Sequence, residues 1–211
     1  MNKSLLLLGG GGHCASIIDT LQRANQHVRL GIVAPEGADV LGVPVVGVDN
    51  DLSRLKEEGY NAAFVAVGSV GDASIRAKLY KYISELGFET PNIIDPTAIV
   101  SESALLGKGI FIGKRSVIGP RTRLGNNSII NTGAIIEHDC NIGNNAHIAP
   151  GSTLCGSVNI GNGCHVGAGA TVIQGISIGE ESLVGAGAVV IHSVCANKTV
   201  VGCPAKPLEE H

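Results

Sequence analysis

An aliphatic residue occupies every sixth position over the second half of the chain. This period is neither the 3.6 residues of a helix nor the two residues of an ordinary strand. It is typical of a hexapeptide parallel β-helix, in which each unit forms one face and three units complete a triangular coil of 18 residues. The sixteen positions run without an insertion and are Val100, Leu106, Ile112, Ile118, Leu124, Ile130, Ile136, Ile142, Ile148, Leu154, Ile160, Val166, Val172, Ile178, Val184 and Val190.

A small or β-branched residue follows four steps after many of these aliphatic positions, and glycine often follows them directly. We expect the aliphatic side chains to fill the interior of the coils and the small residues to pack near the corners. Gly and Asn at the bends would accept backbone angles that a Cβ atom resists. The small positions include Ser116, Thr122, Ser128, Ala134, Cys140, Ala146, Ser152, Cys164, Ala170 and Ala188.

The first part of the chain has a different pattern, in which short apolar runs alternate with segments of helical spacing. Such alternation predicts a small parallel α/β domain. The pattern changes near Asp95-Pro96, so we predict a Rossmann-like domain over 1–96 and an all-β parallel β-helix over 97–211. The predicted strands are 4–8, 28–33 and 62–67, and the predicted helices are 14–26, 51–58 and 74–86.

Composition narrows the classes of function. The 211 residues include 30 glycines and only six aromatic residues, which suits a repetitive backbone with an aliphatic core. The net charge is −3 and the basic residues are scattered, which argues against nucleic acid as a partner. The four leucines near the N-terminus are too few for a signal sequence, and no stretch approaches the roughly 20 apolar residues of a membrane span. The six cysteines lack CxxC spacing, so we expect reduced thiols, no metal site and a cytoplasmic protein.

A glycine-rich loop separates the first predicted strand from the first predicted helix. Gly10-Gly11-Gly12-His13-Cys14-Ala15 fits the pattern G-x-G-x-x-A, in which helix N-terminal amides hold a phosphate. The second strand ends in Val33-Ala34-Pro35 with only Glu36 as a nearby acid, and about 95 residues are few for a dinucleotide domain. A nucleotide-sugar diphosphate is therefore the better candidate than NAD, and a tight turn without a ligand is the alternative.

Two groups of histidines could carry chemistry. Glu137, His138 and Asp139 lie between the inward positions Ile136 and Cys140, so they face outward, and a neighbouring carboxylate can orient an imidazole as a general base. His147 and His165 are 18 residues apart and stack on successive coils. They could donate hydrogen bonds to a thioester carbonyl, or they could form a surface or subunit-interface ladder.

Together these motifs resemble the NeuD/PglD-type sugar acyltransferases. The resemblance includes the GGGGH loop, the E-H-D triplet, the segment Asn144-Asn145-Ala146-His147-Ile148-Ala149-Pro150-Gly151 and the closing Val201-Gly202-Cys203-Pro204-Ala205-Lys206-Pro207, and it covers nearly the whole chain. It implies a left-handed β-helix and a homotrimer. It also implies a nucleotide-linked amino sugar on the N-terminal domain, acetyl-CoA between adjacent β-helices, His138 as the base and Asp139 as the acid that orients it.

The resemblance also implies the remaining site residues. The sugar nucleotide would contact Gly10, Gly11, Gly12, His13, Gly68, Ser69 and Asn131. Acetyl-CoA would contact His147, Gly167, Ala168, Gly185 and Ala186. One departure concerns the nucleotide, because an Asp pair that family members often carry after the second strand is replaced here by Ala34-Pro35-Glu36.

The predicted reaction is direct acetyl transfer from acetyl-CoA to the 4-amino group of a nucleotide-linked 4-amino-4,6-dideoxy sugar, with a backbone amide or His147 stabilising the oxyanion. The alternatives are O-acetylation of a sialic acid, a metal-dependent carbonic anhydrase on the same β-helix, and a non-catalytic paralogue. A basic cluster on the first coils could meet a diphosphate, but we interpret it as a solvated cap; it comprises Lys114, Arg115, Arg121 and Arg123.

Overall fold

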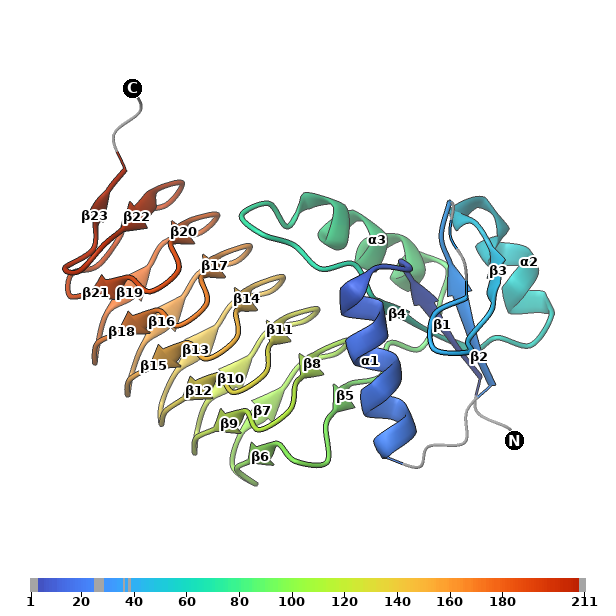
Figure 1. Ribbon diagram of the computed structural model, residues 1–211, viewed down its shortest axis with the longest axis horizontal. Helices are drawn as coiled ribbons and strands as arrows, with labels where there is room; N and C mark the ends of the chain where they lie inside the picture. The colour runs from blue at the N-terminus through green and yellow to red at the C-terminus, as the bar shows by residue number, and fades with distance from the viewer. Residues whose placement is uncertain (1–3, 25–28, 36, 38, 209–211) are drawn as a thin grey trace.

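The computed structural model describes residues 4–24, 29–35, 37 and 39–208 (Figure 1). Its N-terminal part is a parallel four-stranded sheet in the order β3-β2-β1-β4. The strands are β1 (Ser4–Leu8), β2 (Arg29–Val33), β3 (Val45–Gly47) and β4 (Ala62–Val65), and the helices are α1 (Gly12–Arg23), α2 (Leu52–Glu57), α3 (Ser74–Glu85) and the short 3₁₀ helix η1 (Asp49–Asp51). The predicted positions Gln26, Val28 and Glu36 lie outside the described residues.

Strand β1 is apolar throughout because both faces of its sheet are covered. Leu5 and Leu7 pack with α1 and with the first coils of the β-helix, whereas Leu6 and Leu8 pack with α2 and α3 on the opposite face. The sheet is therefore flanked by helices on both sides, as the alternation of strands and helices predicts. Over the described ranges, every helix is too short or too polar to cross a membrane.

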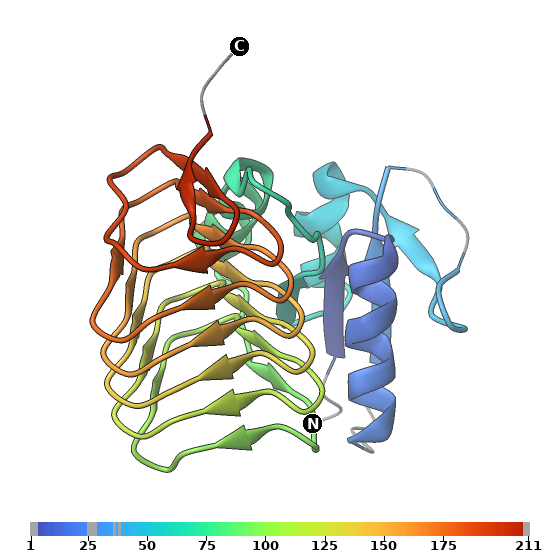
Figure 2. The same cartoon turned by 60° about the vertical axis from the view of Figure 1, so that its left-hand side comes forward.

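The rest of the chain winds into a three-sided prism of short strands, each of two residues except β22 with three (Figure 2). We call its sides the domain-facing sheet, the second sheet and the third sheet. The domain-facing sheet holds β5 (Ile93–Ile94), β8 (Phe111–Ile112), β11 (Ile129–Ile130), β14 (His147–Ile148), β17 (His165–Val166), β20 (Leu183–Val184), β22 (Thr199–Val201) and β23 (Lys206–Pro207). The second sheet holds β6 (Ile99–Val100), β9 (Val117–Ile118), β12 (Ile135–Ile136), β15 (Thr153–Leu154), β18 (Thr171–Val172) and β21 (Val189–Val190). The third sheet holds β7 (Leu105–Leu106), β10 (Arg123–Leu124), β13 (Asn141–Ile142), β16 (Asn159–Ile160) and β19 (Ser177–Ile178).

The strand register confirms the coil length that the sequence predicts. Ile129 pairs with His147 and His147 with His165, which is a step of 18 residues per coil. The aliphatic positions from Ile112 to Val190 are buried in one continuous core, and Val100 and Leu106 pack against it at the open first coils. The ten small positions are also buried. The fold is the left-handed parallel β-helix that the resemblance implies.

The glycines of the repeat have two distinct roles. From Leu106 to Val184, the left-handed backbone conformation falls on the third residue after each aliphatic position, where Asn145 and Asp139 stand as well as glycine. The glycines directly after the aliphatic residues are not in the left-handed conformation. They are required because the next coil leaves no room for a side chain there. A Cβ atom on Gly143 would lie 2.6 Å from the backbone nitrogen of Asn162 in the next coil.

The two architectures meet at Asp95. Strand β5 precedes this residue and already pairs with β8, so the first coil begins just upstream of the boundary at 96/97, which itself stays a prediction. The carboxylate of Asp95 is buried and accepts hydrogen bonds from Thr97 (backbone N–H, 2.9 Å; hydroxyl, 2.6 Å) and from the Thr20 hydroxyl of α1 (3.0 Å). This group ties helix α1 to the start of the β-helix.

Candidate active site

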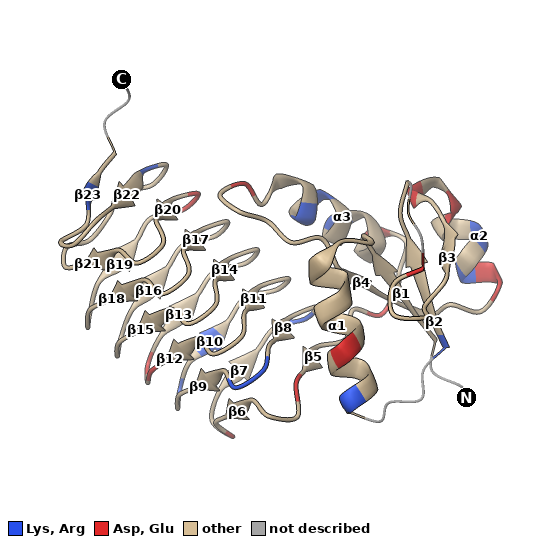
Figure 3. Cartoon of the chain, viewed as in Figure 1, with Lys and Arg blue, Asp and Glu red and all other residues tan. Residues whose placement is uncertain are grey.

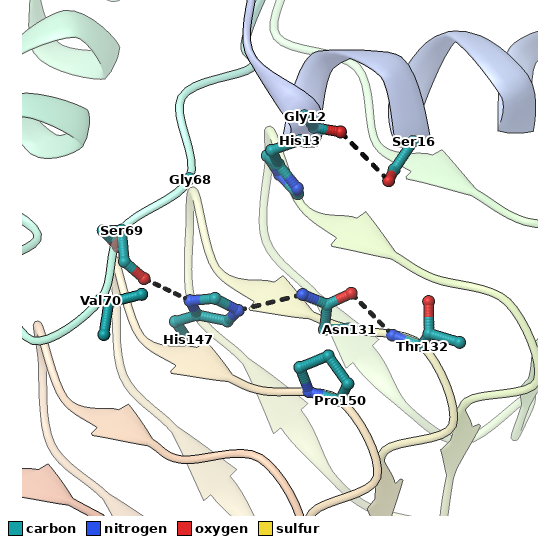
Figure 4. Close-up of a pocket in the computed structure, with 10 residues that line it drawn as sticks. All are labelled: Gly12, His13, Ser16, Gly68, Ser69, Val70, Asn131, Thr132, His147 and Pro150. Carbon is teal, nitrogen blue, oxygen red and sulfur yellow. Dashed lines mark hydrogen bonds between the residues drawn. The ribbon is translucent and has the colours of Figure 1, made fainter. Parts of the chain in front are cut away.

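A cavity of about 440 Å³ lies where the N-terminal domain meets the β-helix (Figure 4). The start of α1 contributes Gly12, His13 and Ser16, and the segment after β4 contributes Gly68, Ser69 and Val70. The β-helix contributes Asn131, Thr132, His147 and Pro150. The first cavity therefore collects the carboxyl ends of β1 and β4, where parallel α/β sheets bind their ligands.

The glycine loop leaves open space above the start of α1. Gly11 is the N-terminal cap of the helix, and a Cβ atom on Gly11 or Gly12 would meet nothing within 4 Å. The first amides of α1 thus face a region that can take an anion. Gly12 and His13 line the first cavity, whereas Gly10 packs beside Ala34 and is not among its lining residues.

A chain of hydrogen bonds crosses the first cavity from one domain to the other (Figure 4). The backbone oxygen of Ser69 lies 2.7 Å from His147 Nδ1, and His147 Nε2 lies 3.2 Å from Asn131 Nδ2. Asn131 Oδ1 accepts the Thr132 backbone N–H at 2.8 Å. Because a carbonyl oxygen can only accept, Nδ1 carries the proton of His147 and Nε2 accepts from Asn131. In this tautomer His147 has no N–H left to donate to a thioester or an oxyanion.

Burial keeps the histidines of this region neutral. The pKa of His147 is lowered to about 3, mainly by burial. The hydrogen bond to the Ser69 carbonyl acts in the opposite direction, and the nearby His165 and Arg76 add to the lowering. Burial, and then Arg76, lower the pKa of His13 to about 4, and the same two causes lower the pKa of His165. His147 and His165 stack edge to face with centroids 4.8 Å apart, as their spacing in the sequence predicts.

Arg76 is a buried cation at the same junction. Its side chain, from α3, is 1% exposed and donates to the backbone oxygens of Asn127 and Asn145 and to the Ser69 hydroxyl, at 3.3 Å for the last. Burial lowers the pKa of Arg76 to about 10, so the guanidinium remains charged at neutral pH. It therefore fastens α3 to two turns of the β-helix and raises the positive potential beside the histidines.

A second cavity of about 420 Å³ continues along the β-helix. It shares Val70, Asn131, His147 and Pro150 with the first cavity, so the two are adjoining. Its lining brings together every residue predicted to contact acetyl-CoA, namely His147, Gly167, Ala168, Gly185 and Ala186, with His165 among them. These residues lie on the domain-facing sheet and on the turns that lead from it to the second sheet, which we call the first edge.

His138 and Asp139 lie on another edge of the prism. They occupy the turn between β12 of the second sheet and β13 of the third sheet, which we call the second edge, and they line neither cavity. His138 Nδ1 lies 2.7 Å from Asp139 Oδ2. Arg121 donates to both oxygens of Asp139, from Nε at 2.6 Å and from Nη2 at 2.7 Å. Hydrogen bonds from Arg121 first, and then from His138, hold the pKa of Asp139 well below its usual range.

This geometry defines the tautomer of His138. Asp139 is a carboxylate and accepts the Nδ1 proton, so Nε2 carries the lone pair and points away from the carboxylate. That arrangement is the one a general base requires. Among the described residues, no three His, Cys, Asp or Glu side chains are grouped so as to hold a metal ion.

Comparison with known proteins identifies the family. Residues 4–83 match the PglD N-terminal domain, 121–156 match the bacterial transferase hexapeptide repeat, and 105–136 and 157–191 match the hexapeptide repeat of succinyl-transferase. PerB from Caulobacter crescentus, crystallised with CoA and GDP-perosamine, is 39% identical over 98% of this chain and 97% of its own, with a TM-score of 0.93. The chain belongs to the PglD-type sugar N-acetyltransferases.

Two further structures place this N-acetyltransferase among its relatives. The acetyltransferase domain of PglB from Neisseria gonorrhoeae FA1090, solved with acetyl coenzyme A, is 32% identical over 99% of this chain and 100% of its own, with a TM-score of 0.93. WeeI from Acinetobacter baumannii AYE is 23% identical over 98% and 100%, with a TM-score of 0.78, and shows the shared fold. The resemblance inferred from the motifs is thus confirmed.

Sequence reasoning missed several contacts around the cavities and around His138. The sequence pattern favours a solvated cap for the basic residues of the first coils, where Figure 3 shows Lys and Arg in blue. Arg121 instead pairs with Asp139, and the spacing of 18 residues between them indicates this contact. Lys114 of the same cluster pairs with Asp19 of α1. No pattern in the sequence indicates the burial of Arg76, because a single arginine in a predicted helix is normally exposed.

Proposed function

We propose that this enzyme transfers an acetyl group from acetyl-CoA to the 4-amino group of a nucleotide-linked 4-amino-4,6-dideoxy sugar. The observation that carries the proposal is the near full-length similarity to PerB, which was crystallised with CoA and GDP-perosamine. The two adjoining cavities support it, because one adjoins a phosphate-type loop and the other is lined by the glycine and alanine residues of the first edge.

The ligands are assigned by the chemistry of each cavity. The sugar diphosphate lies at the N-terminus of α1, with the sugar in the first cavity near Asn131. The nucleoside base extends along the sheet edge to a small cavity of about 250 Å³ beside Pro35 and Asp49. The pantetheine arm of acetyl-CoA follows the second cavity past Gly167 and Gly185. A cytoplasmic site of action fits these substrates and the six free cysteines.

The separation of the two edges supports a homotrimer. In one chain, His138 on the second edge and the cavities on the first edge are divided by the second sheet. A second copy that lays its second edge against the first edge would bring its His138 to the cavities. Three copies of a triangular prism can repeat this heterologous contact and close the ring. Each active site then consists of one chain's cavities and its neighbour's His138.

The reaction follows from these placements. The sugar nitrogen attacks the thioester carbonyl carbon while His138 Nε2 accepts a proton from it. The carbon–sulfur bond then breaks, sulfur leaves with the electron pair, and the imidazolium returns the proton to give the thiol of CoA and the amide. No covalent bond to the enzyme is formed. Cys140 is unsuited to that role because it is buried and burial raises the pKa of its thiol.

A backbone N–H of the first edge is the proposed donor to the oxyanion. The sequence left two donors open, a backbone amide or the His147 ring, and the tautomer of His147 removes the second. Asn131 Nδ2 gives one proton to His147 and retains another for the substrate. His147 therefore acts by holding Asn131 in place.

A thiol-release assay with acetyl-CoA tests the function. The acceptors are GDP-perosamine, UDP-, dTDP- and GDP-linked 4-amino-4,6-dideoxy sugars, and free sialic acid. We expect turnover on one amino sugar, and its identity names the nucleotide that the Pro35 cavity accepts. Turnover on sialic acid alone would replace the proposal by O-acetylation, and release without any acceptor would indicate hydrolysis.

A further inference from the structure

Residues from three successive coils of the β-helix meet at the corner that holds His138. Arg121, on the preceding coil, is 18 residues before Asp139, and Gly156, on the following coil, is 18 residues after His138. The left-handed conformations of Arg121 (φ 58°) and Asp139 (φ 61°) place both side chains at the same corner, one above the other. These four residues form what we call the His138 column.

Arg121 fixes the carboxylate that fixes the imidazole. Its guanidinium takes both oxygens of Asp139 in a two-pronged contact, and Oδ2 also accepts from His138 Nδ1. A carboxylate held at two points cannot rotate away from the ring. The positive charge also offsets the negative charge of Asp139, which would otherwise favour the imidazolium over the neutral imidazole.

Gly156 provides the space in which the ring lies. A Cβ atom at this position would lie 2.5 Å from His138 Cε1 and 2.6 Å from Nε2, closer than Cβ atoms approach other heavy atoms in proteins. The backbone of Gly156 is outside the left-handed region, so no turn geometry demands glycine here. Gly125 and Gly143, which directly follow an aliphatic residue, approach the backbone of the next coil, whereas Gly156 approaches the ring of His138.

We propose that Arg121 and Gly156 are positioning residues for His138, Arg121 acting through Asp139 and Gly156 through the space it leaves for the imidazole. The proposal rests on the proposed role of His138 as the base. The charged groups of this turn and of the turns stacked directly below and above it are Glu137, Asp139 and Arg121, because the turn above contributes Gly156 and Ser157. Arg123 lies next to this corner on β10, which pairs with β13. Arg121 is the basic group that pairs with Asp139.

The first test compares Arg121→Ala with Arg115→Ala. Arg115 occupies the equivalent left-handed position of the preceding turn (φ 55°), so both variants place Ala in the same backbone conformation. Long-range ¹H–¹⁵N spectra of the ligand-free enzyme follow the His138 ring, whose signals are assigned by their loss in His138→Gln. In Arg121→Ala we expect the ring to take up its proton at higher pH than in Arg115→Ala, because the charge of Asp139 is then no longer offset by the guanidinium. An unchanged midpoint would overturn the role of Arg121.

Kinetics of acetyl transfer provide the second readout. With GDP-perosamine or the amino sugar that the enzyme turns over, the acid limb of kcat/KM should move to higher pH in Arg121→Ala, and Arg121→Lys should recover part of the shift. In an Asp139→Asn background, Arg121→Ala should have no further effect on the limb. A uniform fall in rate, with the limb unmoved, would mean that Arg121 is merely structural.

Gly156→Ala tests the space for the ring. We expect kcat to fall roughly 10²-fold, the scale of a small misplacement of a reacting group. We also expect Gly156→Ala to lower Tm in the parent and to leave Tm unchanged in His138→Ala, where the ring is absent. Equal loss of Tm in both backgrounds would refute the proposed contact.

These outcomes separate the positioning proposal from the proposed function. If His138→Ala keeps the parental turnover, the base is wrong, yet the spectra still report whether Arg121 controls the ring. If His138→Ala is inactive while Arg121→Ala matches Arg115→Ala in both titration and kcat/KM, the positioning role of Arg121 fails and the base stands.

Discussion

The molecule holds histidines in two contrasting environments. His147, beside the N-terminal domain, is 7% exposed, and both ring nitrogens are occupied by Ser69 and Asn131. The side chain of His138 on the second edge is 45% exposed and hydrogen-bonds through Nδ1 to a carboxylate. A carbonyl partner and burial remove the first ring from proton transfer, whereas a carboxylate partner and an exposed position on its own chain suit the second to it. The hydrogen-bond partner therefore assigns the role.

The largest effect should come from the exposed ring. We expect His138→Ala to lower kcat by about 10²- to 10⁴-fold, the usual contribution of a general base, with little change in stability because the side chain is half-exposed. Turnover with the amino sugar identified by the acetyl-transfer panel and a urea unfolding curve measure the two quantities. Loss of folding together with activity would show that His138 has a structural role, and the proposed difference in role between His138 and His147 would be wrong.

The buried rings should control how stability depends on pH. In the unfolded chain histidines bind a proton below about pH 6.5, whereas in the fold the pKa of His13 is about 4 and that of His147 about 3. Between pH 6.5 and pH 4 the unfolded state thus holds more protons, so stability is complete above pH 6.5 and falls as the pH is lowered.

The size of this loss can be measured. Each buried ring contributes a slope of about 1.4 kcal/mol per pH unit in the free energy of unfolding. Urea unfolding at pH 7, 6 and 5 should show a shallower slope in His147→Phe than in the parent, while Arg115→Ala keeps the parental slope. Equal slopes in all three proteins would show that His147 titrates normally.

His147→Phe should also weaken catalysis, by less than His138→Ala. The phenyl ring keeps the shape of the imidazole but leaves the Ser69 carbonyl and Asn131 Nδ2 without their partner, which costs about 1–3 kcal/mol in stability. Because Asn131 is then free to turn, we expect kcat/KM to fall about tenfold. A fall as large as that of His138→Ala would mean that His147 takes part in the chemistry itself.

The repeat made the β-helix predictable, and the same repeat explains what was missed. The positions from Ile112 to Val190 are buried because the period of six places them inside, and that requires no knowledge of the rest of the chain. The sequence does not predict strand β3 (Val45–Gly47), because its three residues show no alternation of apolar and polar side chains. Contacts between coils follow the step of 18 residues, so the pair of Arg121 and Asp139 was implicit in the sequence.

Contacts between the two domains could not be derived from any period. The bond from His147 to Ser69 and the burial of Arg76 depend on how α3 and the segment after β4 dock on the prism. The tautomer of His147, and with it the loss of its expected donor role, follows from that docking. Sequence patterns fix which side of a strand faces outward, but they do not say what lies opposite.

The smallest effect is expected at an exposed contact of the same domain interface. Lys114 Nζ lies 2.6 Å from Asp19 Oδ2 of α1, and the two side chains are 32% and 44% exposed. A double-mutant cycle with Lys114→Ala and Asp19→Ala should give a coupling of about 0–1 kcal/mol that shrinks in high salt, because water and ions screen exposed charges. The buried bond from His147 to Ser69 joins the same domains without full charges and should respond little to salt. A coupling at Lys114 as large as the loss in His147→Phe, and insensitive to salt, would show that exposure does not separate the two kinds of contact.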